Sequence, residues 1–267
     1  MNSLPVMLSI AGSDPSGGAG IQADLKTAGA LGVYGAAALT ALTVQNTRGV
    51  TGIHAVPPSF VADQVRAVLD DLDVGAIKIG MLGTADVVGA IAEVLARHDV
   101  PVVLDPVMVA TSGDRLVPED TVDAIRTTLL PLATVITPNV PEAAVLGRAE
   151  PAKDAEALED VALGLREVGA AAVLVKGGHL GGPESVDVLA DDDGVRVFAA
   201  PRIDTPNTHG TGCTLSSAIA SGIALGMPLR DAVAMAKDFL TGALRSGADR
   251  SVGHGHGPVD HLWRQRG

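Results

Sequence analysis

The stretch NTHGTGCTLSSAI (residues 207–219) contains residues that could hold an anion and move a proton. In it, Gly210, Thr211 and Gly212 precede Cys213, the only cysteine among 267 residues. Consecutive backbone N–H groups at a turn that opens a helix bind anions, and small residues let a phosphate approach the backbone. The alternative is a glycine-rich helix entrance in which Cys213 is a small buried hydrophobe. The place of this stretch, after a hairpin and beyond a strand end, favours anion binding.

Two further motifs follow expected strands. TPNVPE supplies Asn139 and Glu142 at a helix start, where residues three apart share a face. A carboxylate there could hold Mg²⁺ beside substrate phosphates, usually through water. Taken alone, a solvated first-turn glutamate is the stronger interpretation. VLVKGGH places Lys176 directly after a strand, with Gly177 and Gly178 behind it, which suits a polyphosphate; the alternative is a surface lysine at a turn.

The glycine-rich loop GSDPSGGAG (residues 12–20) resembles two nucleotide-binding motifs without matching either. Gly18, Gly20 and Ala23 fit GxGxxA, but the carboxylate expected about 20 residues further on is missing. A P-loop is excluded because Leu25 stands where its second glycine must be. An oxidoreductase built on this loop is therefore disfavoured.

A small-molecule-binding loop and a tight turn remain as interpretations of residues 12–20. Asp14 and Asp24 favour binding, because we expect a purely structural turn not to require them. The terminal GHGHG (residues 253–257) with His261 could suggest a metal site. The context is a glycine-rich terminal segment, so we do not expect metal there.

Strands and helices alternate along the chain, which predicts a single α/β domain over residues 1–267 with a mostly parallel, three-layer sheet. Ligands of such sheets bind beyond the carboxyl ends of the strands, where nearly all the unusual residues fall. This coincidence indicates an enzyme. We expect strands at 6–12, 36–46, 76–82, 101–108, 134–139 and 171–179, an edge excursion at 49–58, a hairpin at 185–203 around Asp193-Gly194, and helices at 21–32, 60–72 (capped by Ser59), 85–99 (capped by Thr84), 118–130, 155–169, 213–225 and 229–247.

Composition excludes several classes of function. A net charge of −12 argues against a nucleic-acid partner, which needs a basic face, and 2% aromatic residues leave no stacking platforms. The start of the chain has no basic segment typical of a signal peptide. The least polar run, residues 28–44, is interrupted by glycines and threonines, so no membrane span is expected. A single cysteine is consistent with the reducing cytoplasm.

Taken together, the motifs resemble the bacterial hydroxymethylpyrimidine/phosphomethylpyrimidine kinases of thiamine biosynthesis, in order and over essentially the whole chain. The motifs are IAGSDPSGGAGIQADLKT, TALTVQNTRGV, KIGML, LDPVM, TPNVPEA, VKGGH, NTHGTGCTLSSAIA and VGHGHGPVDH. The resemblance implies a ribokinase-like three-layer α/β/α sandwich. It also implies that ATP and Mg²⁺ serve to phosphorylate 4-amino-5-hydroxymethyl-2-methylpyrimidine and then its monophosphate. A pyridoxal or pyridoxine kinase and a non-catalytic pyrimidine sensor are the alternatives.

The resemblance also implies roles for individual residues. Cys213 stands where most sugar kinases of the superfamily carry an aspartate base, at the end of the anion hole formed by Gly210, Thr211 and Gly212. The implied pyrimidine pocket contains Gly12, Asp24, Gln45, Met81 and Val107. The implied ATP contacts are Asn139, Lys176, Gly177, Gly178 and His179, with Glu142 near the metal.

Three further expectations concern the flap, the assembly and the base. VATSGDRL (residues 109–116) would be the active-site flap, although Thr111 occupies a place where many relatives carry lysine. The family is usually dimeric, which implies a homodimer. The ordinary pKa of a thiol is about 8.5, and a helix N-terminus can lower it into a range useful for a base.

Overall fold

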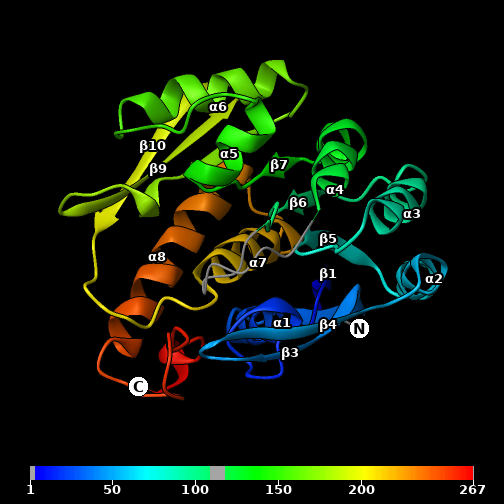
Figure 1. Cartoon of the computed structure of the whole chain (residues 1–267), viewed down its shortest axis with the longest axis horizontal. Coiled ribbons are helices and arrows are strands. Elements are labelled where there is room, and N and C mark those ends of the chain that lie inside the picture. The colour runs from blue at the N-terminus through cyan, green and yellow to red at the C-terminus, as the bar shows by residue number, and fades with distance from the viewer. Residues whose placement is uncertain (1–3, 109–117, 267) are drawn as a thin grey trace.

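A mostly parallel sheet forms the centre of the molecule, as the sequence predicts (Figure 1). The computed structural model describes residues 4–108 and 118–266. Within those residues the main sheet has eight strands in the order β10-β9-β8-β7-β6-β5-β1-β2. The last six in this order are parallel, while β9 pairs antiparallel with both β8 and β10. The strands are β1 (Val6–Ala11), β2 (Tyr34–Leu39), β5 (Val74–Ile79), β6 (Val102–Leu104), β7 (Val135–Ile136), β8 (Val173–Lys176), β9 (Glu184–Asp191) and β10 (Gly194–Pro201).

Helices cover both faces of this sheet, which makes the fold a three-layer sandwich (Figure 1). Strand residues alternate between two cores, as the period of a strand requires: Leu8 packs with α2 to α6, and Met7 packs with α1, α7 and α8. The helices are α1 (Gly20–Ala30), α2 (Pro58–Leu69), α3 (Ala85–Leu95), α4 (Glu119–Ala124), α5 (Val140–Gly147), α6 (Ala157–Glu167), α7 (Thr211–Ala224) and α8 (Leu229–Gly247).

The predicted strand at 36–46 is wrong in one respect, because the structure divides it at Thr40. The first half is β2, which pairs with β1. The second half, β3 (Ala41–Asn46), leaves the main sheet and pairs antiparallel with β4 (Gly49–Ala55), the predicted edge excursion. The hydroxyl of Thr40 donates to Met81 O at 2.6 Å and fixes the point of departure. The β3–β4 ribbon carries Thr43 and Gln45 to the pocket described below.

Local capping explains some helix starts and corrects others. The side chain of Thr84 accepts a hydrogen bond from Val87 N and begins α3, as predicted; such a cap is worth about 1 kcal/mol. Ser59 is not a cap, because Pro58 already occupies the first turn of α2, where the missing N–H of proline costs nothing. The helix predicted at 118–130 is α4 followed by a π-helical turn and a short 3₁₀ turn.

The glycines around GHGHG let this segment pack closely against other parts of the backbone. A Cβ on Gly255 would lie 2.0 Å from Thr47 O, and one on Gly257 would lie 2.0 Å from Asn207 Oδ1. The glycines therefore let the segment pack against the turn of the β3–β4 ribbon and against the loop before α7. Among the described residues, no group of three or more His, Cys, Asp or Glu side chains could hold a metal ion.

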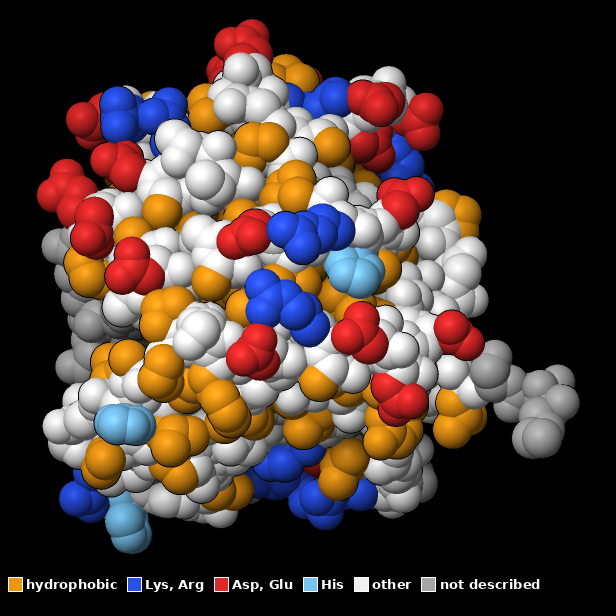
Figure 2. Space-filling view, turned by 90° about the vertical axis from the view of Figure 1, so that its right-hand side faces the viewer, with side chains coloured by type: hydrophobic (Ala, Val, Ile, Leu, Met, Phe, Trp, Pro, Cys, Tyr) orange, Lys and Arg blue, Asp and Glu red, His pale blue; other side chains and the backbone are white. Residues whose placement is uncertain are grey.

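The molecular surface carries charges of both signs. On the face drawn in Figure 2, acidic and basic side chains are interspersed and no broad basic patch forms. In the part of the chain that the structure describes, no helix has the length and apolar character needed to cross a bilayer.

The first prediction concerns His261, which is buried in the C-terminal segment with Nε2 3.1 Å from Thr214 Oγ1. Burial lowers the pKa of His261 from 6.5 to about 4. Between these values the unfolded chain binds more protons, so the free energy of unfolding should fall as the pH decreases. From this group alone we expect unfolding at pH 5 to cost about 2 kcal/mol less than at pH 7.5.

Urea denaturation of the parent protein and of His261→Gln at both pH values measures this effect. In His261→Gln, the difference in the free energy of unfolding between the two pH values should be smaller by about this amount. Replacing the exposed His98 with Gln should leave that difference unchanged. Equal pH dependence in the parent protein and in His261→Gln would contradict the assignment.

Candidate active site

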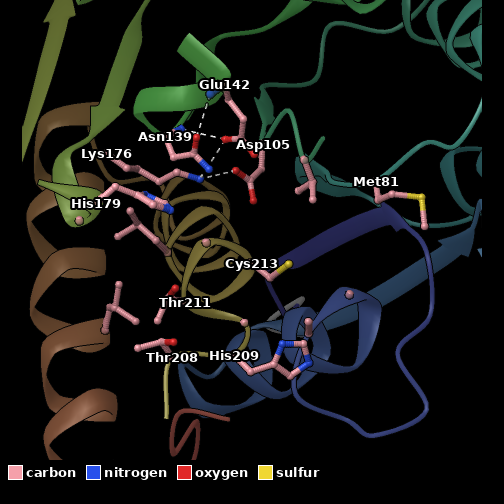
Figure 3. A pocket seen from close by; sticks show the side chains of 18 of the residues that line it. Met81, Asp105, Asn139, Glu142, Lys176, His179, Thr208, His209, Thr211 and Cys213 are labelled. Carbon is pink, nitrogen blue, oxygen red and sulfur yellow. Dashed lines mark hydrogen bonds and ion pairs between the residues drawn. The ribbon is translucent and has the colours of Figure 1, made fainter. Parts of the chain in front are cut away.

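A pocket of about 730 Å³ lies at the carboxyl ends of the parallel strands. It is lined by residues that follow β1, β5, β6, β7 and β8, together with the first turn of α7 and the β3–β4 ribbon (Figure 3). Most of the residues singled out from the sequence meet there. These are Gly12, Gln45, Met81, Val107, Asn139, Glu142, Lys176, Gly178, His179, Gly210, Thr211, Gly212 and Cys213.

The first turn of α7 has the geometry of an anion site. Gly210 is the N-cap residue with φ +82°, a conformation that favours glycine. Thr214 N donates the first backbone bond of the helix to Gly210 O at 2.8 Å. Gly212 and Cys213 come before Thr214 in the chain, so their N–H groups have no acceptor within the helix. Gly212 and Cys213 both line the pocket, which is the position that the predicted backbone anion hole requires.

The two glycine-rich loops interlock behind the anion hole. A Cβ on Gly210 would lie 1.9 Å from Gly18 O, and a Cβ on Gly18 would lie 2.4 Å from His209 Cδ2. His209 Nε2 lies 2.7 Å from Asp14 Oδ2, and both side chains are buried. The loop after β1 and the loop before α7 therefore form one packed unit.

Asp14 organises the first of these loops. Its carboxylate accepts hydrogen bonds from Ser16 and from the backbone N–H groups of Gly18 and Ala19. Burial by itself would raise the pKa of Asp14, but the bonds from His209 and Ser16 outweigh burial and lower the pKa to about 2. The expectation that a structural turn does not require Asp14 is wrong, because this carboxylate holds the turn together.

A lysine and two carboxylates form the opposite wall (Figure 3). Lys176 Nζ lies 2.6 Å from Asp105 Oδ1 and 4.0 Å from Glu142 Oε2. Burial would lower the pKa of Lys176, but the carboxylates of Asp105 and Glu142 outweigh burial and raise it. Lys176 thus stays charged beside the anion hole, and a Cβ on Gly212 would lie 3.3 Å from its Nζ.

Asn139 and Glu142 form a reciprocal capping box at the start of α5. Asn139 Oδ1 accepts from Glu142 N at 2.9 Å, and Glu142 Oε2 accepts from Asn139 N at 2.8 Å. Glu142 is buried, so the interpretation of a solvated first-turn glutamate is wrong. Burial raises the pKa of Glu142 to about 7, against the opposing effect of Lys176. A cation beside this carboxyl would favour its charged form.

The pKa of Cys213 differs from the value expected from the sequence. Burial raises the pKa of its thiol to about 11, although Lys78 opposes the effect. The expectation that the helix N-terminus lowers this pKa into a neutral range is therefore wrong. At neutral pH the residue is a protonated thiol that faces the cavity (Figure 3).

Two predicted contact residues lie outside the pocket wall. Asp24 is fully buried, and its carboxylate accepts hydrogen bonds from Ser9, Ser217 and Lys78 beneath the cavity. Gly177 is also buried: a Cβ there would lie 2.1 Å from Val186 O. The structure therefore gives both positions packing roles and places neither against a ligand in the cavity.

Gly12, Gln45 and Met81, which the resemblance assigns to a pyrimidine pocket, line another part of the cavity. A Cβ on Gly12 would lie 2.5 Å from Met81 Cε, so only glycine leaves room for this methionine in its observed position. Gln45 Oε1 accepts from the hydroxyl of Thr43 at 3.1 Å. The predicted flap, including Thr111, lies outside the described residues.

Sequence reasoning did not single out five charged residues of the pocket: Lys78, Asp105, Asp187, Arg202 and Lys237. For Asp105 a signal exists, because an acid directly after a buried strand lies where ligands of such sheets bind. Lys78 and Lys237 also line the cavity, and Lys237 Nζ lies 2.7 Å from Asp187 Oδ2. Lys237 interrupts an apolar stretch of α8, a signal that could have identified it.

Comparison with known proteins agrees with this geometry. The family model "Phosphomethylpyrimidine kinase" matches residues 14–260. A hydroxymethylpyrimidine/phosphomethylpyrimidine kinase from Rhizobium meliloti (strain 1021) is 54% identical over 261 residues, covering 97% of each chain.

Among solved structures, a Bacillus subtilis pyridoxal kinase in complex with ADP has a TM-score of 0.90 and 36% identity, covering 98% of this chain and 99% of that one. A phosphomethylpyrimidine kinase from Clostridium difficile 630 has a TM-score of 0.78 and 39% identity, covering 88% of this chain and 97% of that one. These likenesses place the fold among the ribokinase-like kinases, as the sequence predicts.

The second prediction tests the interlocked loops with Gly210→Ala and a matched control, Gly226→Ala. Both glycines have φ +82°, but no heavy atom lies within 4 Å of a Cβ built on Gly226. Alanine at this φ costs about 1–2 kcal/mol at either site. Gly210→Ala should lose an additional 1–3 kcal/mol or so, because its Cβ overlaps Gly18 O. Denaturant unfolding of both variants measures the difference, and equal losses would show that the loops do not interlock.

Proposed function

The chain belongs to the phosphomethylpyrimidine kinase family, and from this premise we propose that it phosphorylates 4-amino-5-hydroxymethyl-2-methylpyrimidine and then its monophosphate, with ATP as donor. The observation that carries the proposal is the convergence in one pocket of a backbone anion hole, Cys213 and Lys176. Such an arrangement suits phosphoryl transfer, which needs alignment and charge neutralisation more than covalent chemistry. A non-catalytic sensor would require none of these groups.

Each pocket residue has a role in this proposal. The N–H groups of Gly212 and Cys213 hold the transferring phosphoryl group, and the ammonium of Lys176 offsets its developing charge. Gln45 reads the aminopyrimidine, since its amide both donates and accepts hydrogen bonds. Asn139, Gly178 and His179 lie on the ATP side of the cavity. Cys213 Sγ, as thiolate, takes the proton of the hydroxymethyl group.

Glu142 is the residue we propose for Mg²⁺. Its buried carboxyl, whose pKa is raised to about 7, would be stabilised in the charged form by a neighbouring cation. The donor set fits this ion, because Mg²⁺ usually binds one or two carboxylates together with waters and substrate phosphates rather than an all-protein cage. Bound Mg²⁺ would neutralise phosphate charge.

Pyridoxal is the second candidate substrate, because pyridoxal kinases share this fold at a TM-score of 0.90. A coupled assay of ADP release with the pyrimidine, pyridoxal and ribose separates the possibilities. We expect the highest kcat/KM with the pyrimidine. Higher kcat/KM with pyridoxal would reverse the assignment, and no ADP release with any substrate would favour a sensor.

We further propose that the protein is a cytoplasmic homodimer. The outer face of the β3–β4 ribbon exposes Leu42 and Val44, and Val44 pairs across the ribbon with Gly52, which cannot cover it. A second copy of the chain could cover these side chains. Sedimentation analysis of the parent protein and of Val44→Glu tests the assembly, and a monomeric parent would refute it. The single free cysteine fits a reducing compartment.

The third prediction concerns Glu142→Gln. Glutamine can still accept from Asn139 N, so the capping box and the fold should survive. Without the carboxylate, the Mg²⁺ concentration for half-maximal activity should rise by about tenfold or more. A Mg²⁺ titration at saturating substrates measures this, with the exposed first-turn Glu159→Gln as control. An unchanged Mg²⁺ requirement would remove Glu142 from the metal site.

The fourth prediction concerns the pH dependence that Cys213 imposes. With a pKa of about 11, the thiolate is a fraction of roughly 10⁻⁴ at pH 7 and increases about tenfold per pH unit. If the thiolate is the base, single-turnover phosphoryl transfer should rise with pH above 8, where Glu142 is already ionised. Cys213→Asp should remove this slope, because a carboxylate is ionised throughout the range.

Single-turnover measurements between pH 8 and 10 at saturating substrates test this prediction. Cys213→Ala should lose roughly 10²- to 10⁴-fold in rate, the usual contribution of a positioned base, and should lose the slope. An alanine variant that keeps the parent slope and a rate within a few-fold of the parent would show that the cysteine only packs.

A further inference from the structure

Lys78 has an unusual environment for a lysine. It lies on β5 with no solvent exposure, yet it is among the residues that line the pocket next to Cys213. Its ammonium donates to both carboxylate oxygens of Asp24, at 2.9 and 2.8 Å. Taking an ammonium out of water carries a large penalty, which an apolar side chain at this position would avoid. The pair therefore calls for an explanation beyond stability.

Asp24 connects this pair to the first turn of α7. Its Oδ1 lies 2.5 Å from the hydroxyl of Ser217, and the same hydroxyl lies 2.6 Å from Cys213 O. Its Oδ2 accepts from Ser9 at 2.6 Å. One carboxylate thus joins β1, β5 and α7 directly beneath Cys213, and it fixes the position of the Lys78 ammonium relative to that residue.

The charges around Cys213 come from four elements: Lys78 on β5, Asp24 on α1, Asp105 after β6 and Lys176 on β8. Burial is the largest influence and raises the pKa of Cys213. Lys78 is the largest opposing influence, and its effect is larger than that of either Asp24 or Asp105 taken singly. Burial would lower the pKa of Lys78 itself, but Asp24, Cys213 and Asp105 together outweigh burial and raise it, so the ammonium stays charged.

We propose that Lys78 is a positioning residue whose ammonium, held by Asp24, stabilises the thiolate of Cys213 at the floor of the pocket. The proposal rests on the function proposed above. In the reaction the hydroxymethyl proton passes to Cys213 Sγ while the oxygen bonds to phosphorus and the bond to the ADP oxygen breaks. Lys78 keeps its own proton throughout and acts only through its charge.

The test is the rate of alkylation of Cys213 by iodoacetamide in the folded, ligand-free protein, followed by mass spectrometry. Only the thiolate reacts, and Cys213 is the sole cysteine, so the signal has one source. Alkylation requires no phosphoryl transfer, so the result is independent of whether the proposed kinase activity is correct.

We expect opposite changes when the two members of the pair are replaced. At pH 8, Lys78→Met should react about tenfold more slowly, the effect of losing one nearby opposite charge. Asp24→Asn should react faster, because it removes an anion and leaves the cation. Lys78→Arg keeps the charge and should restore the parent rate to within about threefold. Lys237→Met removes the lysine of a different buried pair that lines the cavity, Lys237–Asp187, and should leave the alkylation rate unchanged.

A purely structural pair would give a different result. Loosening of the floor would expose the thiol and accelerate alkylation in both Lys78→Met and Asp24→Asn. Changes of equal sign, an unchanged rate in folded Lys78→Met, or the absence of any folded Lys78 variant by circular dichroism would each overturn the proposal. If Lys78→Met and Lys78→Arg both fold and only the first is slow, the charge of Lys78 is the cause.

Discussion

The pocket depends on the pairing of charges that have been taken out of water. Among the described residues, Lys78, Lys176 and Lys237 line the one cavity, and each forms an ion pair with an aspartate at 2.6–2.8 Å. An unpaired buried ammonium would lose its proton or destabilise the fold, whereas a paired one remains charged. The chain, with a net charge of −12, can therefore present cations to a phosphate ligand.

Sequence patterns predicted the parts of this arrangement that are local. The strand ends, the β9–β10 hairpin and the glycine-rich start of α7 follow from the period of apolar residues and from turn chemistry, although the hairpin turn falls one residue earlier, at 192–193. Local sequence patterns could not predict the ion pairs, because the paired residues lie far apart in sequence. Asp24 and Lys78 are 54 positions apart, and Asp14 and His209 are 195 positions apart. Only the packing of α1, β5 and α7 brings Asp24 beneath Cys213, and no local signal encodes that packing.

The ionisation of Cys213 shows how competing effects must be compared by size. The N-terminus of a helix stabilises a negative charge by about 0.3–1 kcal/mol, and by about 2 kcal/mol in favourable buried geometry. Raising a thiol pKa by two units corresponds to about 3 kcal/mol in the opposite direction. Burial therefore exceeds the helix effect, and sequence alone gave no measure of burial at this position. Further positive charge must come from elsewhere in the pocket if the thiolate is to form.

Different parts of the pocket wall are suited to the phosphate and to the ring of the substrate, and this bears on substrate choice. In the function that we propose, the anion hole, Lys176 and the interlocked loops act on phosphate and on the reacting hydroxyl, groups that a hydroxymethylpyrimidine and a pyridoxal have in common. The likeness to a pyridoxal kinase at a TM-score of 0.90 is consistent with a shared catalytic half. Discrimination between the rings must then lie with side chains that touch the ring alone. We assign this role to Gln45 and Met81, which line the cavity from the β3–β4 ribbon and from the loop after β5. Since the ribbon pairs only with itself rather than with the main sheet, its side chains can change between relatives without disturbing the buried ion pairs that keep the pocket charged.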